Sequence, residues 1–292
     1  MRDVSKWAFA GFGEDSTLPK EVLLSPDNSR YYMKYAWESK TPRTHLEDVN
    51  EVIAAKIAEL LQLNTIKAEL AYRNGKRGCL SLDYVEQYRA ELDEAGAVLL
   101  ELEFGESYRK LQNSRLKGVE LIDSGFDLLN RFSYFNKIRY EFISMNLFDI
   151  LIGNQDRHPY NWVMLFSNSR SFFGPLYDNG ASLVFQLPDE RLVQMISDKN
   201  QMENYYLNMR VKLGLFECKK APVLATDVLT YCITNYKDEV KQFEELLLHF
   251  SLQQFDDFLN QFPLFTDTRK HFLKVFIRHR REKILEAIKE GS

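Results

Sequence analysis

The chain has few cysteines, no long apolar run and no excess of basic charge, and each absence excludes a class of protein. The 292 residues include only three cysteines, widely separated and without a Cys-x-x-Cys pair, so a disulfide framework is not expected. No window holds the eighteen or so apolar residues of a membrane span, and the first residues lack the apolar core of a signal peptide. A net charge of −4 gives no general attraction to nucleic acid. These features indicate a protein of a reducing cytoplasm that does not bind nucleic acid directly.

The hydrophobic content of 45% is enough for a sizeable core, and its pattern divides the chain in two. Residues 1–86 are mostly strand-like, with Asn74-Gly75 as a strong hairpin turn. They contain one helix, which is expected to begin with Thr44 as N-cap and Glu47 completing a capping box. Residues 87–292 are mostly helical. The sequence therefore predicts an α+β, bilobal fold with a small β-rich N-lobe and a larger helical C-lobe.

Within the second part, helical patterns cover residues 90–104, 116–130 and 136–151. A short β segment interrupts them at residues 162–166 and 172–176. Helices resume near residue 199 and continue to the C-terminus.

The most informative segment is a polar loop between apolar runs, residues 153–161, Gly-Asn-Gln-Asp-Arg-His-Pro-Tyr-Asn. It places Asp156 and Asn161 five positions apart, and Asp178 follows a predicted strand seventeen positions after Asn161. Phosphoryl transfer needs one carboxylate to orient a hydroxyl, and an amide with a second carboxylate to hold Mg²⁺ on the phosphates of ATP. An Asx-rich turn is the alternative for this loop. An overlapping pair, Asp149 and Asn154, lies partly inside an apolar helix and is interpreted as structural.

This loop, together with residues 174–178, Gly-Pro-Leu-Tyr-Asp, resembles the catalytic and metal-binding core of the HipA-like serine/threonine kinases. The resemblance is tight over about thirty residues and extends loosely to the full chain through the order of its elements. It implies a protein-kinase-like fold with ATP and Mg²⁺. Asp156 would be the catalytic carboxylate, and Asn161 and Asp178 would bind the metal. It also implies a compact member that lacks the extra N-terminal subdomain of longer relatives.

A kinase also needs a cation on the phosphates and a carboxylate that holds this cation. Lys34, on a predicted strand, fits the first role, with Lys20 as its competitor. Glu51 fits the second because it shares a small-residue helix face. It also resembles the glutamate at the start of this helix in the family. Glu47 is its rival.

Three further predictions concern the edges of the nucleotide site. The segment joining the two lobes, Asp83, Tyr84 and Val85, is expected to meet adenine. Ser16 and Thr17 are the candidates for autophosphorylation, which the family undergoes in this region. His158 is expected to support the loop rather than to act as a base.

The predicted function is an ATP-dependent serine/threonine protein kinase of HipA type with a protein substrate. The family implies a bacterial cytoplasmic toxin of a toxin–antitoxin module, with an antitoxin or a small N-subdomain-like protein as partner; delivery to a host cell as an effector is the alternative. Two other classes stay open. The run Asp-Arg-His-x-x-Asn also resembles phosphoinositide kinases, which would make the protein a lipid kinase. A nucleotide-binding pseudokinase module is the third class.

Overall fold

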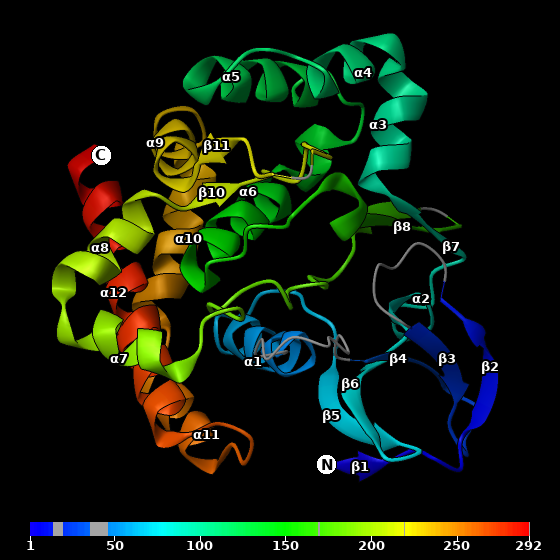
Figure 1. Ribbon diagram of the computed structural model, residues 1–292. Helices are drawn as coiled ribbons and strands as arrows, with labels where there is room; N and C mark the ends of the chain where they lie inside the picture. The colour runs from blue at the N-terminus through cyan, green and yellow to red at the C-terminus, as the bar shows by residue number, and fades with distance from the viewer. Residues whose placement is uncertain (14–19, 36–45, 169, 219, 292) are drawn as a thin grey trace.

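The computed structural model describes residues 1–13, 20–35, 46–168, 170–218 and 220–291. A twisted sheet with one helix lies at the lower right of Figure 1, and helices fill the left and the top. This arrangement confirms the predicted α+β, bilobal fold. Within the described residues, no helix is both long and apolar enough to cross a membrane.

The larger sheet is built from strands in the first 82 residues. Its strands lie in the order β1 (Arg2–Asp3), β5 (Ala68–Arg73), β6 (Lys76–Leu82), β4 (Arg30–Tyr35), β3 (Lys20–Leu24) and β2 (Ala8–Phe12). The expected Asn74-Gly75 turn joins β5 to β6, and both residues have positive φ, 50° and 78°, as a type I′ hairpin requires. Buried Leu23, Met33 and Leu80 form part of a small core on this sheet.

Helix α1 (Glu47–Leu60) lies against this sheet and against α11 (Leu252–Gln261). Buried Ala54, Ala55 and Ala58 allow the close approach. The predicted capping box is wrong, because Leu46 occupies the N-cap position without a side-chain cap and Glu47 is the first helical residue rather than the third. Thr44 lies outside the described residues.

A second sheet joins the two parts of the chain, with β8 (Val163–Ser167) between β7 (Leu92–Ala95) and β9 (Arg170–Phe173). The predicted helix at 90–104 is therefore wrong over residues 90–95. Residues 92–95 pair with β8, and α3 (Gly96–Phe104) begins only after them. The short helix α2 (Tyr84–Gln87) lies between the two sheets in sequence. The predicted boundary between residues 86 and 87 stays a prediction.

Helices build the rest of the molecule. Their bounds are α4 (Glu106–Gln112), α5 (Gly118–Leu129), α6 (Phe135–Ile152), α7 (Asp189–Ser197), α8 (Lys199–Leu207), α9 (Ala225–Asn235), α10 (Lys237–His249) and α12 (Asp267–Gly291). A 3-10 turn, η1 (Pro159–Asn161), precedes β8, and a small hairpin pairs β10 (Arg210–Val211) with β11 (Val223–Leu224).

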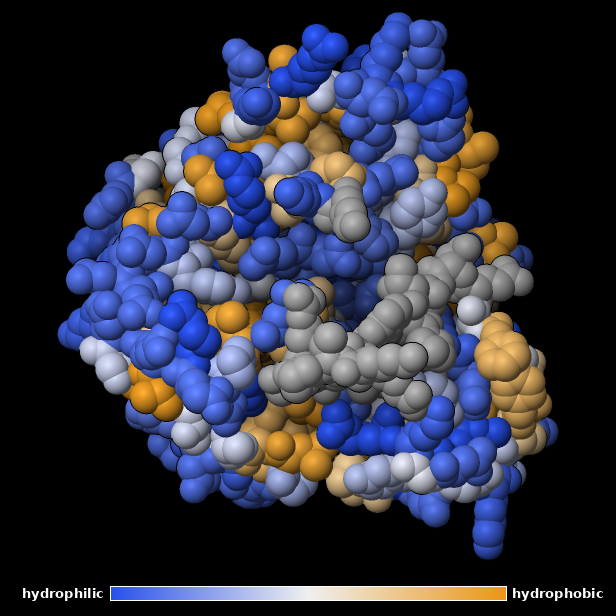
Figure 2. Space-filling view, in the orientation of Figure 1, coloured by the Kyte–Doolittle hydropathy of each residue, from blue (hydrophilic) through white to orange (hydrophobic). Residues whose placement is uncertain are grey.

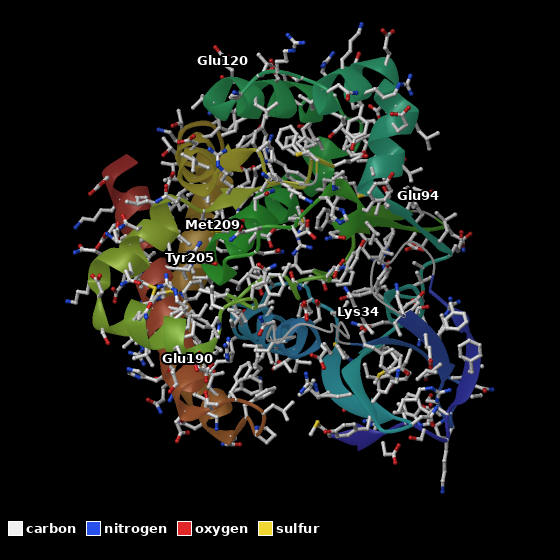
Figure 3. The ribbon with its side chains drawn as sticks, in the orientation of Figure 1. Lys34, Glu94, Glu120, Glu190, Tyr205 and Met209 are labelled. Atoms are coloured by element: carbon white, nitrogen blue, oxygen red, sulfur yellow. The ribbon has the colours of Figure 1, made fainter. Side chains whose placement is uncertain are left out.

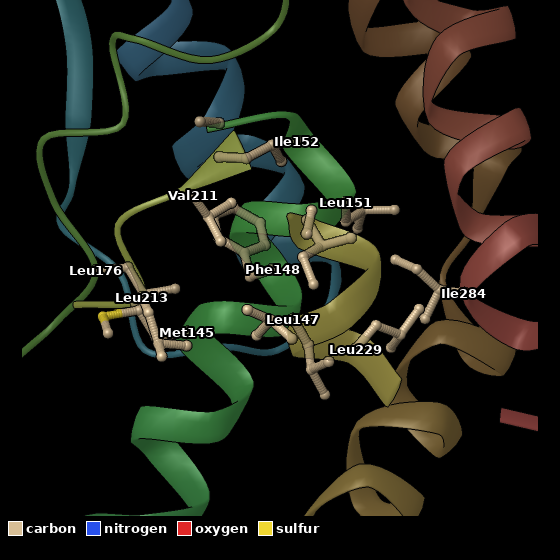
Figure 4. Close-up of a cluster of buried hydrophobic side chains, with 14 of the residues drawn as sticks. Met145, Leu147, Phe148, Leu151, Ile152, Leu176, Val211, Leu213, Leu229 and Ile284 are labelled. Atoms are coloured by element: carbon tan, nitrogen blue, oxygen red, sulfur yellow. The ribbon is translucent and has the colours of Figure 1, made fainter. Parts of the chain in front are cut away.

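The core of the helical part surrounds α6. Nearly every residue in its second half is buried, and a helix that is apolar on all sides belongs in the interior. Figure 4 shows Leu147, Phe148 and Leu151 of this helix among side chains that include Leu229 and Ile284. Each such large side chain contributes about 1.5–3 kcal/mol by burial. The rigid helix therefore presents its C-terminal end, where the polar loop begins, in a defined position.

Candidate active site

A cavity of about 580 Å³ lies between the larger sheet and the helical part. Lys34 and Glu51 line it from the sheet and α1, and Asn161 and Asp178 line it from the loops after α6 and β9. In Figure 2 hydrophilic residues gather near the centre of this face. Figure 3 labels Lys34 at the junction of the sheet and the helices. The structure thus brings together residues that lie up to 144 positions apart.

The polar loop begins where α6 ends. Gly153 occupies the position after the helix with φ 72°, the left-handed conformation that glycine adopts at low cost. The loop then turns back on itself, because the backbone oxygen of Asp156 accepts from the His158 amide at 2.7 Å and from Asn161 Nδ2 at 3.0 Å. The side chain of Asp156 stays 49% exposed, so its carboxylate is open to an incoming group.

Asp178 lines the cavity between the larger sheet and the helical part, from the loop after β9. Its φ is 56°, an uncommon value for a residue other than glycine. Its carboxylate contacts Lys34 Nζ. Burial raises the pKa of Asp178, but the charges of Lys34 and Arg157 outweigh burial, and the pKa falls below its usual value. Asp178 therefore stays ionised, the state in which a carboxylate can bind a cation.

Lys34 is paired differently from the prediction. Its ion-pair partner is Asp178, and among the described residues no ion pair joins it to Glu51. The Glu51 carboxylate instead accepts from Asn179 Nδ2 at 3.3 Å, and its second oxygen is buried without a partner. Burial raises the pKa of Glu51 to about 7, although Lys34 acts in the other direction. Glu51 is thus close enough to feel the charge of Lys34 without bonding to it.

Arg157 is the residue of this loop that sequence reasoning passed over. Its fully buried guanidinium binds Asp149 through two bonds, Nε at 2.9 Å and a terminal nitrogen at 3.0 Å. The same group donates to the carbonyls of Asn161 at 2.7 Å and Tyr177 at 2.6 Å, and to the amide oxygen of Asn179. One cation therefore holds α6, the Asp156 loop and the Asp178 loop together, and Asp149 is its carboxylate partner.

Lys212 was also missed. It is nearly buried, and its Nζ contacts the Asp156 carboxylate at 2.5 Å. It follows Val211 of β10 and comes from a segment 56 positions after Asp156. The one signal in the sequence is its place in an apolar run, Val-Lys-Leu-Gly-Leu-Phe, because a lysine at a buried position needs a partner.

The predicted hinge residues separate into two groups. Tyr84 lines the cavity, stacks on Tyr177 at 5.6 Å between ring centroids and donates to Asp93 at 2.9 Å. Asp83 and Val85 do not line the cavity. The Asp83 side chain caps α2 by accepting from the Val85 amide at 2.9 Å, which occupies that amide.

Strand β7, which follows α2 in the chain, supplies part of the cavity wall. Glu94 and Ala95 of β7 line it together with Val98. Figure 3 labels Glu94 at this edge. Tyr84 is thus the one of the three predicted residues that lines the cavity, and the contact of this segment with adenine stays a prediction.

The structure also describes three other predicted residues, Lys20, Glu47 and His158. Lys20 lines the cavity beside Lys34, its Nζ 4.1 Å from the centre of the Tyr32 ring, and burial lowers its pKa. Glu47 does not line the cavity, whereas Glu51 does. Burial lowers the pKa of His158, and its Nδ1 is buried without a partner.

Two predicted residues, Ser16 and Thr17, lie outside the described part of the chain.

Comparison with known proteins adds an independent observation. Over 147 residues, half of this chain, the sequence is 26% identical to the serine/threonine-protein kinase CtkA of Helicobacter pylori strain J99. The aligned part spans 44% of the length of that relative. The crystal structure of the H. pylori proinflammatory kinase CtkA superposes with a TM-score of 0.77, covering 99% of this chain and 97% of that chain at 19% identity. This chain is a homologue of CtkA.

The predicted resemblance to HipA-like serine/threonine kinases is thereby confirmed at the level of homology and fold. HipA in the toxin–antitoxin complex of Shewanella oneidensis MR-1 also superposes, at a TM-score of 0.46 and 12% identity, over 98% of this chain and 67% of that chain. No protein-family model matches the chain.

Proposed function

We propose that this protein is a serine/threonine protein kinase that transfers the γ-phosphoryl group of ATP to a hydroxyl of a protein substrate. The observation that carries the proposal is the convergence of Lys34, Asn161 and Asp178 on one cavity of a CtkA-like fold, with Asp156 on the same loop as Asn161 and accepting from Asn161 Nδ2 through its carbonyl. The cavity volume of about 580 Å³ lies within the range of sites for small-molecule ligands.

The residues present fit a bound Mg²⁺. Asp178 is an ionised carboxylate and Asn161 an amide on the same cavity, and Mg²⁺ usually takes one or two carboxylates and completes its shell with phosphate and water oxygens. No group of three or more His, Cys, Asp or Glu side chains within the described ranges could hold a metal by itself. When bound, the metal would neutralise charge on the phosphates.

Asp156 would accept the hydrogen bond of the attacking hydroxyl and orient it. Its carboxylate is half-exposed, and Lys212 holds it at 2.5 Å. A carboxylate held in position supplies general-base and orienting effects of about 10²–10⁴-fold. Arg157 would keep Asp156 and Asp178 at a constant separation, because it bonds to both loops.

Lys34 and Lys20 would bind the phosphate oxygens. Lys34 has two carboxylates nearby, Asp178 in contact and Glu51 with a free buried oxygen. A free buried carboxylate oxygen is costly, so Glu51 is the second partner available to Lys34 whenever Asp178 binds another cation. The Lys34–Glu51 pair expected from the sequence would form in that state.

The test is phosphotransfer from radiolabelled ATP with Mg²⁺, to the protein itself and to proteins of a bacterial lysate. Asp156→Ala, Asn161→Ala and Asp178→Ala should each lower the rate at least about 100-fold. Asp127→Ala, at an exposed position of α5, should leave it unchanged. Transfer by Asp156→Ala at the wild-type rate would refute the assignment.

Parallel arms separate the two other classes. Phosphorylation of phosphoinositide vesicles without protein phosphorylation would make the protein a lipid kinase. Thermal stabilisation by Mg·ATP without any turnover would make it a pseudokinase module. Mass spectrometry of the same reaction reports whether Ser16 or Thr17 is modified. The toxin or effector role and the antitoxin partner stay predictions.

A further inference from the structure

A second cavity adjoins the proposed catalytic carboxylate. It measures about 590 Å³ and shares no lining residue with the nucleotide cavity. Asp156 and Gln155 form part of its wall. Tyr205, labelled in Figure 3, lies on this wall and comes from α8, whereas Lys34 of the nucleotide cavity comes from β4. Asp156 therefore faces this second space, through which a hydroxyl can approach it, while Asn161 of the same loop faces the nucleotide cavity.

The charged side chains that line this second cavity are mostly positive. Three cations line it, Arg210, Lys212 and Lys220, and Asp156 is the single acidic residue on its described wall. Lys212 is neutralised by Asp156. Within the described ranges, neither Arg210 nor Lys220 forms an ion pair, so two positive charges are left without a counter-charge.

The β10–β11 hairpin places these two cations together. Arg210 begins β10, and Lys220 stands shortly before β11, with Arg210 opposite Leu224 in the register. The Arg210 guanidinium donates to the Pro222 carbonyl at 2.7 Å, which orients the group while its other nitrogens stay available. A held guanidinium loses less entropy on binding a carboxylate than a free one does.

Another part of the wall is apolar, and its backbone is strained. Val184, Phe185 and Leu187 line it. Leu183 and Val184 have φ of 54° and 52°, and such values are genuine outliers for a branched residue such as valine. The segment is held in place because the Leu183 amide donates to the Ile152 carbonyl and Asn50 Nδ2 donates to the Ser182 carbonyl. Strain that surrounding bonds maintain is typical of functional sites.

We infer that this cavity is the acceptor site of the proposed kinase and that it selects a serine or threonine flanked by acidic side chains. The inference rests on the proposed function. An extended peptide would place an apolar side chain against Phe185 and its carboxylates against Arg210 and Lys220, with the hydroxyl at Asp156. The mixture of apolar and cationic walls favours an acidic peptide over a nucleic acid, whose backbone offers no apolar side chain. Complementary charges of this kind give selectivity rather than great affinity.

The experiment compares two peptides with the full-length protein. Both contain one serine in the same apolar frame, with three glutamates around it in one and three glutamines in the other. Two exposed ion pairs of about 0.2–1 kcal/mol each predict a kcat/KM ratio of about 2- to 30-fold in favour of the acidic peptide. The ratio should shrink towards one in about 1 M salt, where the Debye length is about 3 Å.

A charge-reversed variant tests the residues. In Arg210→Glu/Lys220→Glu the ratio should fall below one, and a third peptide with lysines in place of the glutamates should become the better substrate. Arg170→Glu, on the exposed end of β9 outside both cavities, is the matched control and should keep the wild-type ratio. Each ratio compares two peptides on the same preparation, so a loss of folded protein lowers both rates equally and leaves the ratio unchanged. Arg210→Gln is a milder second variant.

The outcomes separate this inference from the proposed function. Transfer to both peptides with equal kcat/KM, or an unchanged ratio in the double variant, overturns the acidic specificity alone. Absence of any phosphotransfer overturns the proposed function and the acceptor site with it. The last arm compares two competitors of equal charge, a single-stranded oligonucleotide and a serine-free acidic peptide. If only the oligonucleotide inhibits at a given concentration, the cavity binds nucleic acid and the inference is overturned.

Discussion

Replacement of Arg157 by leucine should both destabilise the protein and abolish its activity, for one electrostatic reason. The guanidinium is the only charge partner that the structure gives to the fully buried Asp149 within the described residues. Removing one partner of a buried ion pair leaves an uncompensated charge and typically costs about 3–5 kcal/mol. The contacts to Asn161, Tyr177 and Asn179 disappear with it, so the two loops of the site lose their common support.

This loss in the free energy of unfolding can be expressed as a drop in melting temperature. An unfolding entropy of about 2.1 cal/mol/K per residue gives about 0.6 kcal/mol/K for 292 residues, so 3–5 kcal/mol corresponds to a drop of roughly 5–8 °C. Arg109→Leu is the matched control, because its ion pair with Glu101 is largely exposed and such pairs contribute about 0–1 kcal/mol. That variant should lose less than about 2 °C.

A double variant isolates the cause. Burial raises the pKa of Asp149, and Arg157 opposes this effect, so without Arg157 the folded state binds a proton more readily than the unfolded state does. The deficit of Arg157→Leu should therefore shrink as the pH falls from 7 to 5. Arg157→Leu/Asp149→Asn should recover much of the stability without recovering activity. A melting temperature of Arg157→Leu within 2 °C of wild type at pH 7 would refute the reasoning, as would a double variant less stable than the single one.

Two further predictions use the same assays. Lys212→Met removes a charge-assisted hydrogen bond of about 1.5–3 kcal/mol from Asp156 and should lower kcat about 10- to 160-fold; an unchanged kcat in a folded variant would contradict the positioning role. Burial lowers the pKa of His158 below 6.5, so the unfolded chain binds this proton first and part of the stability is lost as the pH falls below 6.5. His158→Gln should flatten the dependence of melting temperature on pH between 5 and 7, and an unchanged slope would remove His158 as its source.

Several features of the site could be read from the sequence because their causes are local. Asp156 and Asn161 share a nine-residue loop whose first glycine takes the left-handed conformation that ends α6. The Asn74-Gly75 turn needs positive φ at both positions, and these residue types provide it. Strand alternation directs Lys34 into the cleft, since every second residue of a strand faces the same side.

Other features depended on pairing between distant segments. Residues 90–95 carry a helical pattern, yet β8 pairs with residues 92–95 and α3 is shortened. The cavity takes part of its wall from Glu94 and Ala95, which lie on β7 because that strand pairs with β8. In both places a neighbour absent from the local sequence overrode the local preference.

The sequence by itself determined the bilobal α+β plan and the chemical groups for phosphoryl transfer, because hydrophobic periodicity and a short polar motif carry that information. Only the tertiary structure decided how these groups are supported. It pairs Lys34 with Asp178 rather than with Glu51, and it places Arg157 in contact with three segments. It also brings Lys212 into contact with Asp156, 56 residues away in the sequence. The reason is physical: a buried charge takes whichever partner the packing of distant elements brings within hydrogen-bond distance, and spacing along the chain does not encode that distance.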